Sequence, residues 1–439
     1  IYMLINKKNT FEQHDNENGS FYHNSVRFPV LSNNIDDNFE IDVCVIGGGF
    51  TGISTALNLA NKGYSVLVVE ARKIGWGASG RNGGQLGIGM RKNQSFLEKK
   101  LGINHAKQLW KLGLEAVDEA KEHIKKYKIA CALQNGVLIA GSYTKDEKEF
   151  LEEINYIQKN YDFNKYEIFN FKKIKEEINT KKYYSGLLNK GSYHLNPLKF
   201  LLGLTNQLIN LNVNILENTP VTSIEETGEG VKILTRTNII KARYVVVGCN
   251  GYLDKLLGKI RNKFMPINNY IIATEPLGEE KARQLIKNNY AVCDTRFIID
   301  YYRFSEDWRM IFGGGETYTA SFNHDSKNFV KERMYKVFPE LKKYKIEYSW
   351  GGTLAITVNR LPDFGTMMNG KLVYAHGYSG HGLALSTLAG KLIAEKISGF
   401  SDRFNFFESI KHISIPGGDF FRRPIYSAAI AYYKMRDII

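Results

Sequence analysis

Three glycines with the spacing G-x-G-x-x-G, Gly47, Gly49 and Gly52, are the first residues in the sequence that indicate ligand chemistry. In this pattern the first glycine permits a tight turn, the second lets a pyrophosphate approach the backbone, and the third lets a helix pack against a strand. The unpaired N–H groups at a helix start stabilise an anion, so Phe50 and Thr51 are candidate contacts as well. The pattern predicts a phosphate site.

An acidic residue, Glu70, follows these glycines by about twenty residues. At the end of a second strand, a carboxylate at this spacing can accept a hydrogen bond from a ribose 2′-hydroxyl, and its charge disfavours a 2′-phosphate. An incidental acid beside a glycine-rich turn is the alternative, and the order of strand, helix, strand and acid argues against it. The sequence therefore predicts a bound dinucleotide, with Ala71 and Arg72 beside it.

A second glycine-rich segment follows at residues 75–85. Glycines interleaved with Arg, Asn and Gln are typical of a backbone that wraps closely around a flat polar ligand. A flexible surface loop is the alternative, but the short distance from Glu70 places the segment near the dinucleotide. The candidate contacts are Gly77, Ala78, Ser79, Arg81, Asn82, Gly83, Gly84 and Gln85.

The elements that would position these residues follow from the hydrophobic pattern. A β-branched strand at 42–46, a helix at 51–62 and a strand at 66–69 form a βαβ unit. Further strands and helices of this unit's domain are expected at 198–211, 213–216, 231–234, 244–247, 372–375 and 383–397. A second domain is expected from helices at 95–128 and 145–161 and strands at 137–139, 270–273, 297–299 and 309–312.

The expected fold class is α/β, with a Rossmann-like domain on a parallel sheet and an inserted α+β domain on an antiparallel sheet. The expected organisation is an N-terminal extension (1–38), a cofactor domain (39–93, 190–256 and 351–400), a substrate domain (94–189 and 257–350) and a C-terminal tail (401–439) packed on the body.

The amino-acid composition limits which classes of protein this chain can belong to. The chain of 439 residues is 43% hydrophobic and 24% charged, as ordinary globular proteins are. Its four cysteines are far apart in the sequence, so we expect neither a metal cluster nor disulfides. This pattern favours a reducing compartment, and we expect the protein in the cytoplasm. No apolar run reaches the length of a membrane span. The net charge of +14 comes from scattered lysines, which favours compositional drift over a nucleic-acid partner.

The glycine-rich segment together with Glu70-Ala71 resembles the D-amino-acid oxidase-like FAD-dependent oxidoreductase family, in its gamma-glutamylputrescine oxidoreductase branch. Segments spread over nearly the whole chain carry the same resemblance. They are His194-Leu195-Asn196-Pro197, Asp300-Tyr301-Tyr302-Arg303, Phe312-Gly313-Gly314-Gly315, Arg360-Leu361-Pro362, Gly377-Tyr378-Ser379-Gly380-His381-Gly382, Pro416-Gly417-Gly418 and Ala431-Tyr432-Tyr433.

This resemblance implies a glutathione-reductase-like domain that binds FAD. Some members attach FAD covalently through a cysteine, whereas the corresponding residues 350–354 contain none, so noncovalent FAD is expected. The turn from Gly377 to Gly382 precedes a helix, and its amides can face the flavin. The implied contacts are Gly377, Tyr378, Ser379, Gly380, His381 and Gly382, with Val221 at the adenine and Asn250-Gly251 beneath the dinucleotide.

The resemblance also implies an enzyme that oxidises the primary amine of gamma-glutamylputrescine or a similar amine to an aldehyde and ammonia. Tyr301, Tyr302 and Tyr378 are candidates for an aromatic channel, with core packing as the alternative. Arg303 is a candidate for binding a substrate carboxylate, with a structural ion pair as the alternative. His381 is a candidate donor or acceptor beside the flavin, in the protonation range of neutral pH.

The electron acceptor stays open between molecular oxygen and another molecule. Related sarcosine oxidases use a lysine on the strand before the glycine run, and here that strand reads Met310-Ile311-Phe312. An amino-acid oxidase or dehydrogenase of the D-amino acid, glycine or sarcosine type is the first alternative. An RNA-modifying flavoprotein would require a basic groove leading to the flavin, and a catalytically silent flavoprotein would have a blocked channel.

Overall fold

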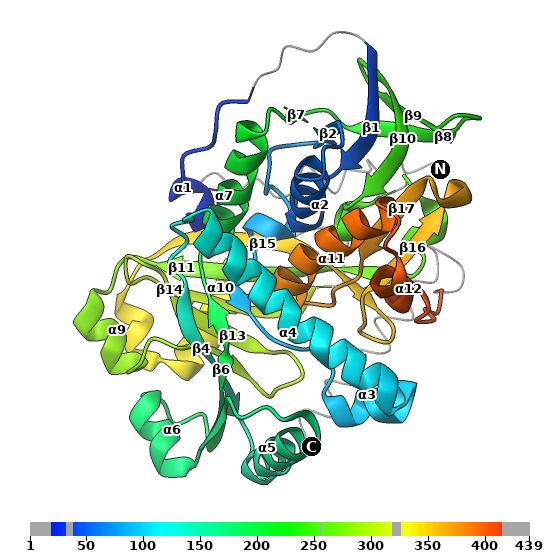
Figure 1. The fold of residues 1–439 in the computed structure, drawn as a ribbon. Coiled ribbons are helices and arrows are strands. Elements are labelled where there is room, and N and C mark those ends of the chain that lie inside the picture. The colour runs from blue at the N-terminus through cyan, green and yellow to red at the C-terminus, as the bar shows by residue number, and fades with distance from the viewer. Residues whose placement is uncertain (1–18, 32–37, 255, 318–325, 415–439) are drawn as a thin grey trace, which may run out of the picture.

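The computed structural model describes residues 19–31, 38–254, 256–317 and 326–414, which form two large sheets with helices around them (Figure 1). Sheet A has the strand order β16-β17-β10-β1-β2-β7, with the β8–β9 hairpin attached to β10. Its strands are β1 (Asn38–Ile46), β2 (Val66–Val69), β7 (Asn214–Leu216), β8 (Val221–Glu226), β9 (Val231–Thr235), β10 (Ile239–Val247), β16 (Asp363–Met367) and β17 (Leu372–His376).

The five strands β7, β2, β1, β10 and β17 are parallel. The second half of β1, residues 43–46, and the whole of β2 are apolar and buried, as parallel strands under helices are. The helices around sheet A are α1 (Phe21–Asn24), α2 (Phe50–Ala60), α7 (Pro197–Asn210), α8 (Gly258–Arg261), α11 (Gly382–Ile397) and α12 (Asp402–Glu408). Because parallel strands end at one edge, the loops after β1, β10 and β17 meet there.

Sheet B has the strand order β15-β11-β14-β13-β12-β4-β6-β3, with β5 beside β6. Its strands are β3 (Gln85–Leu86), β4 (Gln134–Gly141), β5 (Tyr166–Phe169), β6 (Ser185–His194), β11 (Phe264–Thr274), β12 (Ala291–Asp294), β13 (Asp300–Phe304), β14 (Met310–Thr317) and β15 (Ile346–Thr357). All neighbours in it are antiparallel except β12 and β4.

Helices cover sheet B on both sides (Figure 1). They are α3 (Gln94–Leu101), α4 (Ile103–Lys126), α5 (Asp146–Tyr161), α6 (Phe171–Glu177), α9 (Glu279–Leu285) and α10 (Ser326–Val337). Short 3-10 helices lie at Ala78–Gly80, Asn250–Tyr252, Pro339–Lys343 and Met368–Gly370. α6, α9 and α10 pack on one face through a separate apolar core that includes Phe312 and Met334, so the opposite face is turned toward sheet A.

The predicted α/β class is confirmed, and two elements differ from prediction. The helix expected at 95–128 is two helices, because Gly102 breaks it with φ of +86°. The strand expected at 297–299 is wrong, since these residues lie in the turn between β12 and β13.

The domain boundaries also shift. β15 runs to Thr357 within sheet B, so the substrate sheet extends past residue 350, and β3 belongs to sheet B as well. Residues of the expected N-terminal extension are part of the core: Tyr22 is fully buried with its ring 5.5 Å from that of Trp350.

The C-terminal tail packs on the body as far as it is described. Phe407 of α12 is buried, and its ring lies 4.5 Å from that of Phe364. The segments 416–418 and 431–433 lie outside the described residues. Within the described part of the chain, no helix is long and apolar enough to cross a bilayer, and no group of side chains could hold a metal ion.

Candidate cofactor and substrate site

A cavity of about 600 Å³ lies between the start of α2, the turn before α11 and the face of sheet B turned toward sheet A. This volume is within the range of small-molecule and cofactor sites. The cavity collects loops far apart in the sequence: Gly49 after β1, the segment 78–85, Asn250 after β10 and the turn 378–382.

The glycines between β1 and α2 serve the packing predicted for them. A Cβ at Gly52 would lie 1.9 Å from the carbonyl oxygen of Gly47, so only glycine lets α2 approach this turn. Gly49 caps α2 without a side chain, and a Cβ there would lie 2.8 Å from Ser79 Oγ. Ser79 Oγ accepts a hydrogen bond from Phe50 N at 3.0 Å. Because Gly49 has no side chain, the cavity reaches the start of α2, where an anion can bind.

Glu70 at the end of β2 holds the glycine turn. Its carboxylate accepts hydrogen bonds from Gly48 N at 2.6 Å and from Arg72 N at 2.8 Å. Burial raises the pKa of Glu70, and the backbone donors Gly48 and Arg72 oppose that shift. Each carboxylate oxygen can accept a further hydrogen bond, so binding to a ribose hydroxyl is compatible with these contacts.

The segment after Glu70 is folded by its own polar side chains. Asn82 donates to the carbonyl oxygens of Ala78 and Ser79 and accepts from Gly84 N, and Arg81 donates to the carbonyl oxygen of Trp76. These contacts place the backbone of the segment against the cavity.

The side-chain amide of Gln85 shows whether the cavity has a donor that suits a flavin. Its Nε2 is buried, lines the cavity and has no hydrogen-bond partner among the described residues. A buried donor without a partner is costly, and the carbonyl groups of a flavin are acceptors of the kind it lacks. Together with the bare glycine surface at Gly49, this donor fits FAD.

Hydrogen bonds join the turn before α11 to the loop after β10 and to the start of α2. Gly377 N donates to Asn250 Oδ1 at 3.0 Å, and the hydroxyl of Tyr378 hydrogen-bonds Thr51 Oγ1 at 2.7 Å. Ser379 Oγ donates to the Gly377 carbonyl oxygen at 3.1 Å. The two helix starts, of α2 and α11, are therefore held side by side at the cavity.

His381 lines the cavity in its neutral form. Its Nε2 lies 3.0 Å from the carbonyl oxygen of Ile88, which can only accept, so Nε2 carries a proton. Burial, together with the charge of Arg91, lowers the pKa of His381 to about 4 against the opposing effect of backbone contacts. His381 therefore does not titrate near neutral pH, which corrects the protonation range expected for it.

One row of side chains on sheet B forms the floor of the cavity. Leu187, Ile139, Cys293 and Tyr301 pair across β6, β4, β12 and β13 in register, so they project from the same face. Tyr301 donates its hydroxyl hydrogen bond to Asn269 Oδ1. Tyr301 is thus placed where the sequence predicted a channel residue.

Tyr302 lies on the opposite face, because successive residues of a strand alternate. It is 1% exposed, stacks on Phe312 at 5.3 Å and donates to the Tyr183 hydroxyl at 3.2 Å. It does not line the cavity. The alternative of core packing therefore fits Tyr302, and the expectation that it forms a channel with Tyr301 is corrected.

Arg303 is a buried structural side chain. Its guanidinium donates to the carbonyl oxygens of Gly83 at 2.8 Å and Phe304 at 3.0 Å, and to the Tyr22 hydroxyl at 3.0 Å. It supports the cofactor segment from behind and does not line the cavity. Its expected role in binding a substrate carboxylate is not supported by these contacts.

The predicted residues thus divide into two groups. Those lining the cavity are Gly49, Phe50, Thr51, Ala78, Ser79, Arg81, Asn82, Gly83, Gln85, Asn250, Tyr301, Tyr378, Ser379, Gly380, His381 and Gly382. Those outside its lining are Gly47, Gly52, Glu70, Ala71, Arg72, Gly77, Gly84, Val221, Gly251, Tyr302, Arg303 and Gly377.

Several members of the second group are close to the site. Thr219 N donates to the Glu70 carbonyl oxygen at 2.9 Å, which brings the start of β8, with Val221, beside the end of β2. This arrangement is compatible with an adenine contact at Val221.

Apart from Gln85 and Tyr301, the sequence did not indicate the lining from sheet B and its flanking helices. Arg91, Lys92, Trp110, Glu153 and Asn189 line the cavity, yet none belongs to a recognisable pattern. For the floor residues, the alternation of side chains between the two faces of each strand was the signal that could have indicated them.

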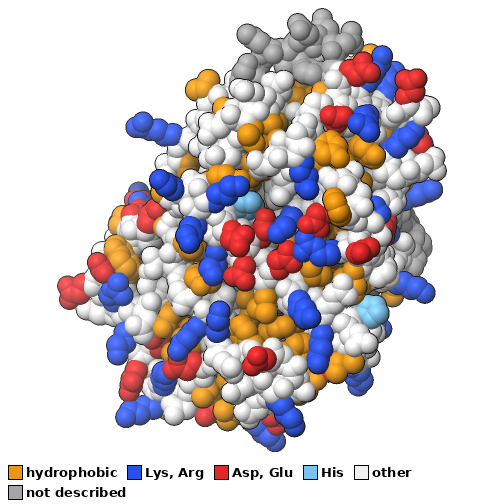
Figure 2. Space-filling model, viewed as in Figure 1, with side chains coloured by type: hydrophobic (Ala, Val, Ile, Leu, Met, Phe, Trp, Pro, Cys, Tyr) orange, Lys and Arg blue, Asp and Glu red, His pale blue; other side chains and the backbone are white. Residues whose placement is uncertain are grey.

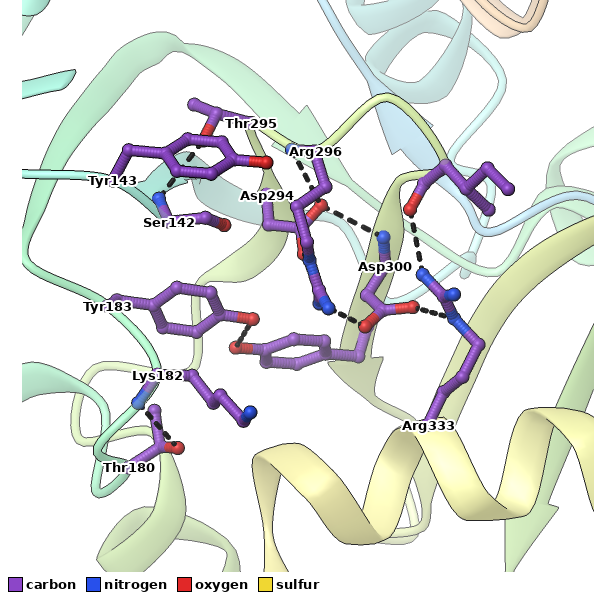
Figure 3. A network of polar contacts seen from close by, with 12 residues as sticks. Ser142, Tyr143, Thr180, Lys182, Tyr183, Asp294, Thr295, Arg296, Asp300 and Arg333 are labelled. Carbon is purple, nitrogen blue, oxygen red and sulfur yellow. Dashed lines mark hydrogen bonds and ion pairs between the residues drawn. The ribbon is translucent and has the colours of Figure 1, made fainter. Parts of the chain in front are cut away.

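A polar network supports the turn between β12 and β13 (Figure 3). Asp300 forms ion pairs with Arg296 and Arg333, and Asp294 pairs with Arg296. Burial raises the pKa of Asp294 to about 6. Since Asp300 precedes Tyr301, this network fixes the strand that carries a floor residue of the cavity.

Comparisons with known proteins agree with this geometry. Residues 42–396 match the family described as FAD dependent oxidoreductase, DAO. The chain is 36% identical over 419 residues to gamma-glutamylputrescine oxidoreductase of Escherichia coli (strain K12), covering 95% of this chain and 98% of that protein. It is 36% identical to probable oxidoreductase OrdL of Haemophilus influenzae, covering 90% and 92%.

The fold resembles the crystal structure of glycine oxidase from Geobacillus kaustophilus. The TM-score is 0.73 at 18% sequence identity, covering 86% of this chain and 100% of the other.

Proposed function

Because the chain belongs to the DAO family of FAD-dependent oxidoreductases, we propose that it oxidises the primary amine of gamma-glutamylputrescine or a similar long amine. The amine loses a hydride and a proton to give an imine, and water hydrolyses the imine to an aldehyde and ammonia, with hydrogen peroxide formed where oxygen is the acceptor. The relative from Escherichia coli carries that substrate in its name and matches almost the full length. The observation that carries the proposal is the continuous cavity from the start of α2 to β6.

Bound FAD supplies the acceptor for the hydride that leaves the carbon bearing nitrogen. Gly49, Phe50 and Thr51 at the start of α2 would hold its pyrophosphate, and Gln85 would donate to its ring system. The residues at the flavin end of sheet B, Gly351 to Leu354, carry no thiol, which supports noncovalent binding.

The residues around the reacting carbon serve to position and to exclude water. Tyr301 and Ile271 form the floor, and Tyr378 and His381 form the opposite wall. An amine must be neutral to lose a hydride from its α-carbon. His381 is neutral and adds no positive charge beside the substrate, which favours the neutral form of the bound amine.

An amino-acid oxidase is the second candidate, and one observation favours it. Arg91 lines the cavity close enough to His381 to lower the pKa of that residue, and a guanidinium so near the flavin turn can bind an α-carboxylate. In that case the reacting nitrogen would lie beside the carboxylate rather than at the end of a chain.

The two candidates are separated by product analysis. The purified protein is incubated with gamma-glutamylputrescine, putrescine, sarcosine or D-alanine, and ammonia and carbonyl product are measured together with peroxide. The proposal expects equal amounts of aldehyde and ammonia from gamma-glutamylputrescine. Turnover of sarcosine or D-alanine, with none of gamma-glutamylputrescine, would instead establish the second candidate.

A further inference from the structure

The end of the cavity farthest from the turn 378–382 is built from β5, β6 and α5. Leu187 is three strands from Tyr301 along the floor, about 14 Å at the usual strand spacing. Asn189 pairs with Tyr166 of β5, and both line the cavity together with Glu153 of α5. This distal end is therefore separated from Tyr301, which the proposed function places beside the reacting carbon, by three strand spacings.

Asn189 offers an unused donor at this end. The residue is 7% exposed, and its Oδ1 accepts a hydrogen bond from Gly191 N at 2.9 Å. Its Nδ2 donates to no described residue, although it lines the cavity. An amide donor that lines a cavity and has no partner among the described residues can donate to an acceptor on a ligand.

Glu153 offers a negative charge beside this donor. It forms no ion pair with any Lys, Arg or His in the described part of the chain. Burial and the charge of Glu98 raise its pKa, and its own charge raises the pKa of Tyr166, which shows that the two lie close together. A cation supplied by a ligand would stabilise this carboxylate.

A second group of side chains that line the cavity has the opposite charge. They are Arg91, Lys92 and Arg360, and the charges of Arg360 and Arg91 add to burial in lowering the pKa of Lys92. The ammonium of an amino-acid head group is therefore favoured beside Glu153 of α5 rather than beside these cations.

We propose that the distal end binds the head group of the substrate, an α-amino acid in its zwitterionic form. Glu153 accepts hydrogen bonds from its ammonium, Asn189 Nδ2 donates to its carboxylate, and the methylene chain lies over Leu187 and Ile139. The inference rests on the proposed function, because it assumes a substrate whose reacting amine and amino-acid head are separated by a long chain.

The test compares two substrates that differ at the head. Gamma-glutamylputrescine carries the amino-acid head, and N-acetylputrescine lacks it while keeping the same amine. Glu153→Gln is expected to raise KM for gamma-glutamylputrescine by about tenfold or more, with kcat and the KM for N-acetylputrescine unchanged. Asn189→Leu is expected to act in the same direction. Glu152→Gln, on the exposed side of α5, is the matched control and should change neither KM.

A binding measurement separates failure of the inference from failure of the proposed function. Calorimetry with gamma-glutamylpropylamide, which has the head but no reacting amine, should give weaker binding to Glu153→Gln than to the parent protein. Equal loss for both substrates, or unchanged binding of the amide, would overturn the inference. If the parent protein fails to oxidise gamma-glutamylputrescine, the proposed function is wrong, and binding of the amide still tests the distal end.

Discussion

Tyr301 and Tyr302 are neighbours on β13, yet they project from opposite faces of sheet B. Tyr301 faces the cavity and its ring lies between Gly83 and Gly313. A Cβ at either glycine would clash with this ring. Tyr302 enters the core that α10 covers and meets Phe312 and Tyr183. The strand alternation therefore places one tyrosine at the cavity and the other in the apolar core.

We predict that Tyr301→Phe and Tyr302→Phe have different effects. Tyr302→Phe removes one buried hydrogen bond to Tyr183, so the free energy of unfolding should fall by about 1 kcal/mol while kcat/KM is retained. Tyr301→Phe removes the hydroxyl in the cavity, so kcat/KM should fall by about tenfold. Steady-state kinetics give kcat/KM and urea unfolding gives the free energy of unfolding for the two variants. An equal loss of kcat/KM in both variants would refute the different roles of Tyr301 and Tyr302.

His381 is the residue whose environment most constrains the pH dependence. Its folded pKa of about 4 is below the ordinary value, so the stability it contributes is present above about pH 6.5 and is lost as pH falls toward 4. At neutral pH the imidazole of His381 is therefore uncharged in the folded protein and largely uncharged in the unfolded chain.

We predict that kcat/KM for an amine substrate shows no inflection near pH 6.5. It should instead rise with pH toward the pKa of the substrate amine, about 10.4 for an alkylamine such as lysine, because the neutral amine reacts. Profiles of the parent protein and of His381→Gln measure this. An acidic limb near pH 6.5 that disappears in the variant would contradict the neutral histidine.

The β1–α2 unit is the element on which cofactor binding depends. The carbonyl oxygen of Gly47 lies where a Cβ of residue 52 would be, so the strand end and helix start form one compact turn. Glu70 closes this turn from β2 through Gly48 N.

We predict that Gly52→Ala loses FAD and lowers Tm, because the added methyl group must separate α2 from β1. Gly258→Ala is the matched control, since nothing lies within 4 Å of a Cβ there and alanine favours a helix. Absorbance at the flavin band and thermal unfolding measure both variants. Full FAD content in Gly52→Ala would show that the turn tolerates a side chain.

The sequence predicted the β1–α2–β2 unit because glycine spacing and parallel strands leave strong local patterns. It did not predict β12 and β13, since short strands in a mixed sheet lack such a pattern, and it placed a strand on residues 297–299. Gly49 and Ser79, which the glycine-rich patterns indicated, and His381, which the family resemblance indicated, all line the cavity. Its substrate side, with Glu153 and Asn189, depends on how distant elements pack.

On the scale of the whole molecule, the cavity exists because two sheets meet along it. An ion-pair network joins the helices over this junction: Arg403 of α12 pairs with Glu115 of α4 at 2.6 Å, and Lys391 of α11 pairs with Glu119 at 2.6 Å. The cavity argues against a blocked channel. Acidic and basic side chains are interspersed on the face in Figure 2, unlike the continuous basic groove that an RNA-modifying enzyme requires.

We predict that FAD is released intact by acid precipitation, because the flavin end of the cavity lacks a thiol in residues 350–354. The protein without FAD should have a lower Tm, and FAD at a hundredfold excess over its Kd should restore about 2.7 kcal/mol of stability. Flavin that stays with the precipitated protein would demonstrate a covalent bond instead.

If one cavity holds both FAD and a long amine, the amine should reduce the flavin within it. Anaerobic mixing of the FAD-loaded protein with gamma-glutamylputrescine, followed at the oxidised flavin band, measures this reduction. We expect bleaching by gamma-glutamylputrescine and no bleaching by D-alanine or sarcosine under the same conditions. A yellow protein that gamma-glutamylputrescine leaves fully oxidised would show that the cavity does not serve this reaction.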